Sequence, residues 1–89
     1  METIQQTLTE RGKTHGKFGD NAHGAQSLKE HFRSSSRWPD LKVEERETLD
    51  QIASKIARLL SSKSATNPDD WRDIAGYATL ALKAVEREG

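Results

Sequence analysis

The sequence contains no cysteine and few aromatic residues, and both shortages exclude classes of protein. Without cysteine the chain has no disulfide framework, no thiolate nucleophile and no cysteine-ligated zinc site, which is consistent with a reducing compartment. The aromatic residues make up 6% of the chain and are too scattered for a platform on which bases stack. No apolar run approaches the roughly 18 residues of a membrane span, and the N-terminus does not resemble a secretory signal. We therefore expect a cytoplasmic protein that makes no contact with a membrane.

The chain also lacks an excess of charge of either sign. Its 14 basic and 14 acidic side chains cancel to a formal net charge of zero. A dedicated nucleic-acid-binding protein takes most of its affinity from clustered lysine and arginine that neutralise phosphates. Nucleic acid is therefore not expected as a partner.

Large apolar residues are scarce as well. Leucine, isoleucine, valine and phenylalanine together number 16 among 89 residues, just under the roughly 20% below which disorder becomes common. A domain of this length buries only about 60% of the surface that its unfolded chain exposes. We expect residues 1–89 to form a single domain whose core is completed by association into a homo-oligomer.

Glycine and proline divide the chain into four segments with helical patterns, so we predict an all-α bundle of about four helices. The first covers about residues 3–11 and is followed by a glycine-rich loop at 11–21. The second begins at a cap provided by Asp20 or Asn21 and runs to about Arg33. A connector at 34–40 follows, because Pro39 disfavours helical geometry in the residue before it.

The third and fourth segments have the clearest patterns. The third is predicted at about 43–62, with Asp40 as a candidate N-cap, and its apolar residues share one face: Leu49, Ile52, Ala53, Ile56, Leu59 and Leu60. The fourth begins with an Asn67 cap and Pro68. Its main apolar face is predicted to contain Trp71, Ile74, Ala75, Ala78, Leu82 and Val85, and its second flank Tyr77, Ala81 and Ala84. A helix that is apolar on two sides needs two neighbours, and another protomer could provide the second.

Two pairs of carboxylates are spaced three residues apart on the predicted helices: Glu47 with Asp50, and Asp70 with Asp73. Converging carboxylates suit Mg²⁺ and the phosphates that it bridges. In an antiparallel hairpin Asp50 lies about 15 Å from the end of its helix, so Asp50 with Asp73 is the most reachable combination. The alternative is that Asp70, like its neighbour Asp69, favours the positive end of a helix dipole, and that the others form surface ion pairs.

Basic residues form two further candidate sites. Arg11, Lys13, His15 and Lys17 alternate with glycines before a helix start, where cations and backbone amides could bind phosphate. The spacing is not that of a P-loop, and a solvated turn is the alternative. A histidine metal site is not expected.

The second basic site is a pair one turn apart on the third predicted helix. Lys55 and Arg58 are expected on the side opposite the apolar stripe of that helix. There they solvate the surface, bind phosphate or neutralise acids of a partner helix.

Three stretches carry a family resemblance: Arg11-Gly12-Lys13-Thr14-His15-Gly16-x-Phe18-x-Asp20-Asn21-Ala22, Ile52-Ala53-x-Lys55-Ile56-Ala57-Arg58 and Trp71-x-Asp73-Ile74-Ala75-Gly76-Tyr77-Ala78. Together they resemble a small all-helical domain of phages and prophages, which is itself similar to the MazG-like nucleotide pyrophosphohydrolases. That similarity implies a helical oligomer in which paired carboxylates bind Mg²⁺ and position a nucleoside triphosphate for cleavage between its α and β phosphates. Here aspartate replaces glutamate in both pairs.

By position, the resemblance implies a set of site residues. The implied catalytic residues are Glu47, Asp50, Asp70 and Asp73, of which Asp50, Asp70 and Asp73 bind the metal. The implied nucleotide-binding residues are Arg11, Lys13, His15, Lys17, Lys55, Arg58 and Tyr77.

Three functions follow from these patterns as expectations. The first is a nucleotide-binding protein of phage type, with Mg²⁺-dependent pyrophosphohydrolase activity as its candidate reaction. The second is a non-catalytic counter-defence protein that sequesters a nucleotide signal or blocks a host defence protein. The third is an interaction module that works through the second apolar side of the fourth helix.

Overall fold

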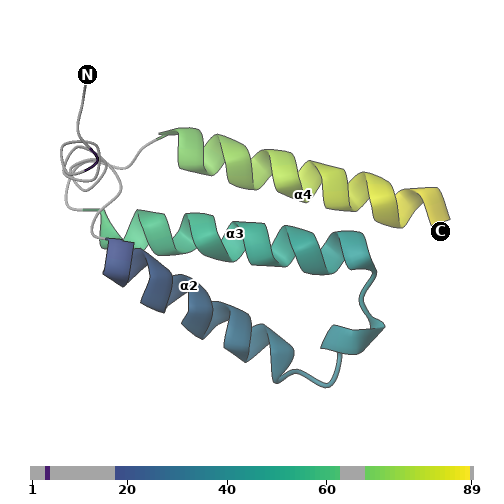
Figure 1. Cartoon of the computed structure of the whole chain (residues 1–89). Coiled ribbons are helices and arrows are strands. Elements are labelled where there is room, and N and C mark those ends of the chain that lie inside the picture. Colours follow the sequence, from purple (N-terminus) through teal and green to yellow (C-terminus); the bar gives the residue numbers. More distant parts are fainter. Residues whose placement is uncertain (1–3, 5–17, 63–67, 89) are drawn as a thin grey trace.

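The computed structural model describes residues 4, 18–62 and 68–88, and within these ranges the ordered elements are all helical (Figure 1). In chain order they are α2 (Phe18–Arg33), the short 3₁₀ helix η1 (Trp38–Asp40), α3 (Val43–Ser61) and α4 (Pro68–Glu88). No strand occurs in the described ranges, so the all-α prediction is confirmed. The predicted first helix lies outside the described residues except for Ile4, which leaves the count of four helices as a prediction. None of the described helices combines the length and apolar character needed to cross a bilayer.

Helix α2 begins at Phe18, two residues before the predicted cap. The glycine-rich loop was therefore predicted too long at its C-terminal end. Gly19 takes part in the helix, and Asp20 lies in the first turn, where the helix dipole favours a negative charge. Further along, a Cβ built on Gly24 would lie 3.3 Å from the Cβ of Ala57, so the missing side chain lets α2 approach α3 closely.

The connector between α2 and α3 is closed by an aromatic contact. The rings of Phe32 and Trp38 stack with their centroids 5.9 Å apart, and the guanidinium of Arg33 lies 5.1 Å from the centre of the Trp38 ring. Pro39 lies in the first turn of η1, where its missing N–H does no harm. The predicted connector is thus confirmed, and part of it is a single 3₁₀ turn.

Helix α3 has nearly the predicted extent, but its N-cap is different. The N-cap residue is Lys42, whose backbone N–H donates to Oε1 of Glu45 at 3.1 Å. Asp40 is the last residue of η1, so the prediction that Asp40 caps this helix is wrong. At the other end the backbone N–H of Ser62 donates to the carbonyl of Arg58 at 3.1 Å.

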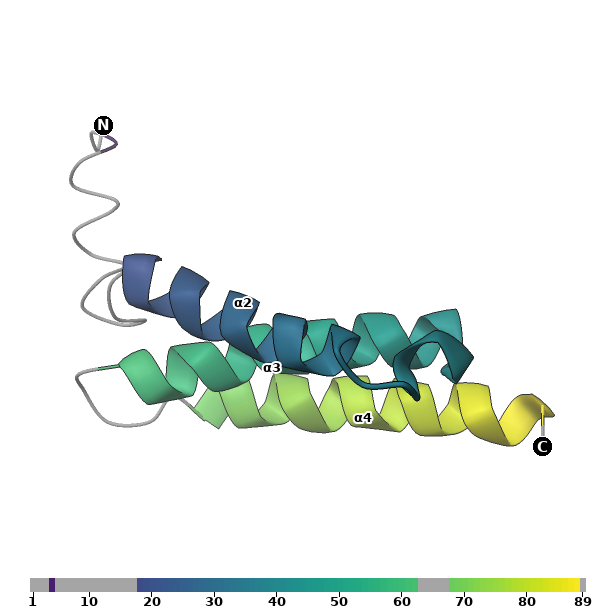
Figure 2. The same cartoon turned by 90° about the horizontal axis from the view of Figure 1, so that it is seen from below.

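Helix α3 lies between the other two helices, and each successive helix runs antiparallel to the one before it (Figures 1 and 2). Every substantial contact among the three helices involves α3. Ala57 of α3 faces Gly24 of α2, and the Ser61 hydroxyl donates to Oδ1 of Asn21. Lys55 contacts α4 instead. Because α2 and α4 approach α3 from different sides, the larger residues of its apolar stripe are not buried. Leu60 is exposed, and the other four are half-buried: Leu49, Ile52, Ile56 and Leu59.

The structure corrects the predicted orientation of α4. The residues that α4 buries or half-buries against α3 are Asp70, Ile74, Tyr77, Ala81 and Ala84. These include the whole of the predicted second flank. Five of the six residues of the predicted main face are instead exposed: Trp71, Ala75, Ala78, Leu82 and Val85. Small side chains on the flank allow close approach, and the charges described below favour this rotation of the helix.

Candidate functional site

Two ion pairs cross the contact between α3 and α4. Lys55 Nζ lies 2.9 Å from Asp73 Oδ2, and Arg58 Nε lies 3.7 Å from Asp70 Oδ1. Of the roles predicted for Lys55 and Arg58, the structure shows the third, because both cations lie beside acids of a neighbouring helix. The side of α3 that carries them is therefore packed against α4 and is not a free surface. Asp70 is only 4% exposed, so this acid lies inside the contact.

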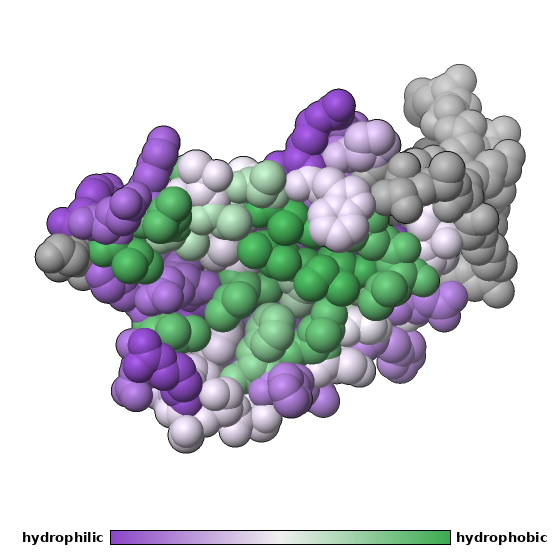
Figure 3. Space-filling model, turned by 180° about the vertical axis from the view of Figure 1, so that it is seen from behind, coloured by the Kyte–Doolittle hydropathy of each residue, from purple (hydrophilic) through white to green (hydrophobic). Residues whose placement is uncertain are grey.

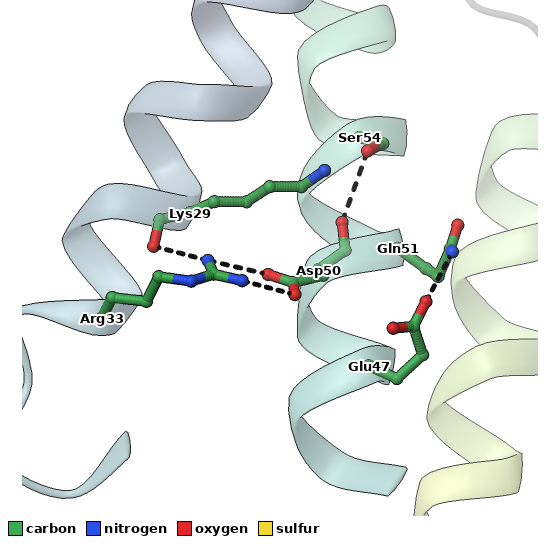
Figure 4. Close-up of polar contacts among 6 residues, drawn as sticks. All are labelled: Lys29, Arg33, Glu47, Asp50, Gln51 and Ser54. Carbon is green, nitrogen blue, oxygen red and sulfur yellow. Dashed lines mark hydrogen bonds and ion pairs between the residues drawn. The ribbon is translucent and has the colours of Figure 1, made fainter. Parts of the chain in front are cut away.

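Asp50 pairs with a cation of the other neighbouring helix (Figure 4). Its two carboxylate oxygens accept hydrogen bonds from Nη1 and Nη2 of Arg33 on α2, at 3.2 and 2.9 Å. The same Nη1 also donates to the backbone carbonyl of Lys29 at 3.0 Å. This paired geometry is the strong form of a guanidinium–carboxylate contact, and it directs Asp50 toward α2.

Glu47 is engaged within its own helix. Its Oε1 accepts a hydrogen bond from Nε2 of Gln51 at 2.8 Å. In Figure 4 this pair lies on the side of α3 nearer α4, whereas Asp50 points toward α2. The two members of the first predicted carboxylate pair therefore diverge.

The predicted metal ligands do not converge in the described part of one chain. With Arg58 opposite Asp70 and Lys55 opposite Asp73, Asp50 lies level with Ala78. That is about 12 Å along the helix from Asp70, since each residue advances the helix by about 1.5 Å. Among the described residues no three His, Cys, Asp or Glu side chains are grouped closely enough to hold a metal ion. Binding of Mg²⁺ by Asp50, Asp70 and Asp73 stays a prediction.

The remaining predicted nucleotide-binding residues are placed in part. The basic loop with Arg11, Lys13, His15 and Lys17 lies outside the described residues. Tyr77 is half-buried, and it lines an open depression on α4. The lining residues are Arg72, Asp73, Gly76, Tyr77, Thr79 and Leu80.

The predicted main apolar face of α4 forms part of a large exposed apolar surface. On α4 the side chains of Trp71, Leu82 and Val85 are 58%, 56% and 40% exposed. Beside them lies the half-buried stripe of α3, with Leu49, Ile52, Ile56 and Leu59. Figure 3 shows apolar side chains gathered in one continuous area along this side of the molecule. We call the exposed stripe of α4 (Trp71, Ala75, Ala78, Leu82 and Val85) together with the half-buried stripe of α3 the open apolar face.

Comparison with models of protein families, with curated proteins and with solved structures found no match.

Proposed function

We propose that this chain is a helical interaction module that binds a protein partner on its open apolar face. One observation carries the proposal: the helices bury small side chains, while the large apolar side chains stay at the surface. Among the described residues no large side chain is fully buried. The buried apolar residues are all alanines: Ala25, Ala53, Ala57 and Ala84. The large apolar side chains that would fill a core lie instead on an open surface.

Covering such a surface with a partner is favourable in free energy. Removing a large apolar side chain from water contributes about 1.5–3 kcal/mol, and monomeric proteins rarely expose continuous apolar patches above a few hundred Å². Within the α4 stripe, Trp71 and Leu82 each keep more than half of their surface in solvent. A partner that covers this face gains that burial without any change in the fold of the module.

The spacing of the α4 stripe indicates what kind of element fits it. From Trp71 to Val85 the stripe advances by alternating steps of four and three residues. This is the spacing of a helix that packs along another helix, because it keeps one narrow seam facing the partner. The contacting element of the partner is therefore a helix.

The charged residues of the site act in this proposal as a scaffold. The pairs Lys55–Asp73 and Arg58–Asp70 orient α4 on α3, so that its apolar stripe lies beside that of α3. A rotation of α4 by one residue, about 100°, would bury the stripe and break both pairs. Acids and bases that were candidates for metal and phosphate binding thus set the shape of a binding surface.

The proposal is tested by photo-cross-linking in the cells that produce this protein. A photoreactive phenylalanine derivative replaces Leu82 in the middle of the exposed stripe. The matched control places it at Ser27, which is exposed and lies on the side of α2 away from the buried Ala25. We expect a defined adduct from position 82, either with this chain or with another protein, and none from position 27. Equal labelling at both positions, or no adduct at position 82, would exclude a binding role for the face.

Nucleotide binding is a second candidate, favoured by one observation. The contact between α3 and α4 gathers four residues implied by the MazG-like resemblance, since Lys55 and Arg58 face Asp73 and Asp70. Tyr77 and Asp73 also line the same depression. A nucleotide with Mg²⁺ would compete for the Lys55–Asp73 pair. The test is a thermal-shift screen of nucleotides with and without Mg²⁺, in which Asp73→Ala is expected to abolish any shift while the helical circular dichroism is unchanged.

A further inference from the structure

We propose that the occupant of the open apolar face is a second copy of this chain, with the two α4 helices packed antiparallel about a two-fold axis near Ala78. The inference rests on the proposed function, because it names the partner of the same face. It is carried by two features of α4 that are self-complementary in this orientation: the order of large and small side chains and the placement of charges.

The stripe is bulky at its ends and small in its middle. Trp71 lies at one end and Leu82 and Val85 at the other, and the centre is formed by Ala75 and Ala78. An antiparallel pair sets the small centres against each other and brings Trp71 of one copy to the Val85 end of the other. The small centre lets the two helix backbones approach closely near the axis. A parallel pair would instead oppose the two Trp71 side chains at one end of the contact.

Charges follow the outer edge of the stripe with the same symmetry. Arg72, Thr79 and Glu86 are all exposed and recur every seven residues, so they form one row beside the apolar residues. In an antiparallel pair Arg72 of each copy lies at the end that carries Glu86 of the other, and the uncharged Thr79 lies at the axis. In a parallel pair the rows of the two copies would lie on opposite sides of the contact, so these charges would not pair with each other. The row therefore favours the antiparallel pair.

A two-fold contact of this kind is closed. The α4 stripe of each copy is covered by the α4 stripe of the other, so this stripe is not left to continue the assembly. The side of α4 about 100° away already packs on α3, and the zero net charge of the chain adds no general repulsion between copies. The expected species has a mass of twice 10.0 kDa.

The first experiment measures association and its dependence on charge. Sedimentation velocity of the purified full chain is recorded over about a hundredfold range of protein concentration, which spans the mass-action transition. We expect a dimer that Ala78→Glu converts to a monomer. Arg72→Glu alone and Glu86→Arg alone should each raise the dissociation constant about tenfold, because each variant replaces two exposed attractions by repulsions. The double variant with both changes restores opposite charges and should return to the wild-type dissociation constant.

The relative orientation of the two α4 helices is measured separately by cysteine cross-linking. The chain has no native cysteine, so only the introduced cysteines react. Chains with Arg72→Cys and chains with Glu86→Cys are mixed and treated with a short bismaleimide. Within one helix these positions are about 21 Å apart along the axis, at about 1.5 Å per residue. The antiparallel pair should therefore cross-link the two kinds of chain to each other and neither kind to itself. Self-linked products would establish the parallel pair and overturn the inference.

The outcomes separate this inference from the proposed function. A chain that stays monomeric at every concentration overturns the second-copy proposal. If position 82 still yields an adduct with a different protein in cells, the face binds a foreign partner and the proposed function stands. If neither a dimer nor an adduct is found, both fail. Assemblies larger than two copies, or a double charge variant no better than the single ones, also contradict the two-fold antiparallel pair.

Discussion

Asp70 is a buried charged residue at the start of α4, and it shows how a single side chain was open to two interpretations. Its position in the first helical turn favours an acid, because the N-terminal end of a helix dipole is positive. Its 4% exposure and its position beside Arg58 add a second role, which is to join α4 to α3. Its neighbour Asp69 also lies in the first helical turn but is exposed and pairs with Arg72 of the same helix.

This difference gives a prediction at the residue scale. Asp70→Ala should lower the free energy of unfolding by about 1–3 kcal/mol, because the partly buried guanidinium of Arg58 loses a compensating charge. The matched variant Asp69→Ala removes a carboxylate that is 70% exposed and pairs with Arg72 at 2.6 Å. That change should cost about 0.5 kcal/mol or less. Urea denaturation at one fixed protein concentration measures both, and equal losses would show that the dipole alone explains Asp70.

Trp71 provides a second residue-scale prediction. In a Trp38→Phe background Trp71 is the only indole, and phenylalanine keeps an aromatic ring against Phe32. Because Trp71 is 58% exposed in one chain, its fluorescence emission should shift to shorter wavelength as protein concentration rises and the second copy covers it. Adding Ala78→Glu should abolish the shift. An emission maximum independent of concentration would show that Trp71 lies outside the contact.

At the scale of elements, two glycines within helices have opposite surroundings. A Cβ on Gly76 of α4 meets nothing within 4 Å, whereas one on Gly24 of α2 lies 3.3 Å from the Cβ of Ala57. Gly76→Ala should therefore stabilise the chain by about 0.5–1 kcal/mol through helix propensity. Gly24→Ala should gain less or destabilise, because it pushes α2 away from α3. Thermal unfolding of the two variants compares them directly, and an equal gain at both positions would contradict the close packing of α2 on α3.

Helix α4 also shows where sequence patterns stop being informative at this scale. Its start at Pro68 and its helical character were predictable, because caps, dipoles and periodicity act over a few residues. The side that it turns toward α3 was not. The helix has two apolar sides about 100° apart, and the choice between them depends on Lys55 and Arg58, which lie on another helix.

At the scale of the whole molecule, stability should depend on association. If the open apolar face is covered by a second copy, unfolding exposes it again, and the apparent free energy of unfolding rises by about 1.4 kcal/mol of dimer, or about 0.7 kcal/mol of chain, for each tenfold increase in protein concentration. Urea midpoints measured at several concentrations should therefore increase for the wild type. For Ala78→Glu they should be constant and lower. A wild-type midpoint that does not change with concentration would mean that the small core of one chain suffices for its stability.

The sequence by itself determined that this protein is helical, where α4 begins, the extent of α3 to within about one residue, and that the core is thin. These properties follow from local rules and from composition. Only the tertiary structure decided that Asp50 turns to α2 while Asp70 and Asp73 turn to α3, and that the stripe from Trp71 to Val85 remains open. The physical reason is that these outcomes depend on which of two similar helix faces finds matching charges across the contact, and such pairings join residues far apart in the chain.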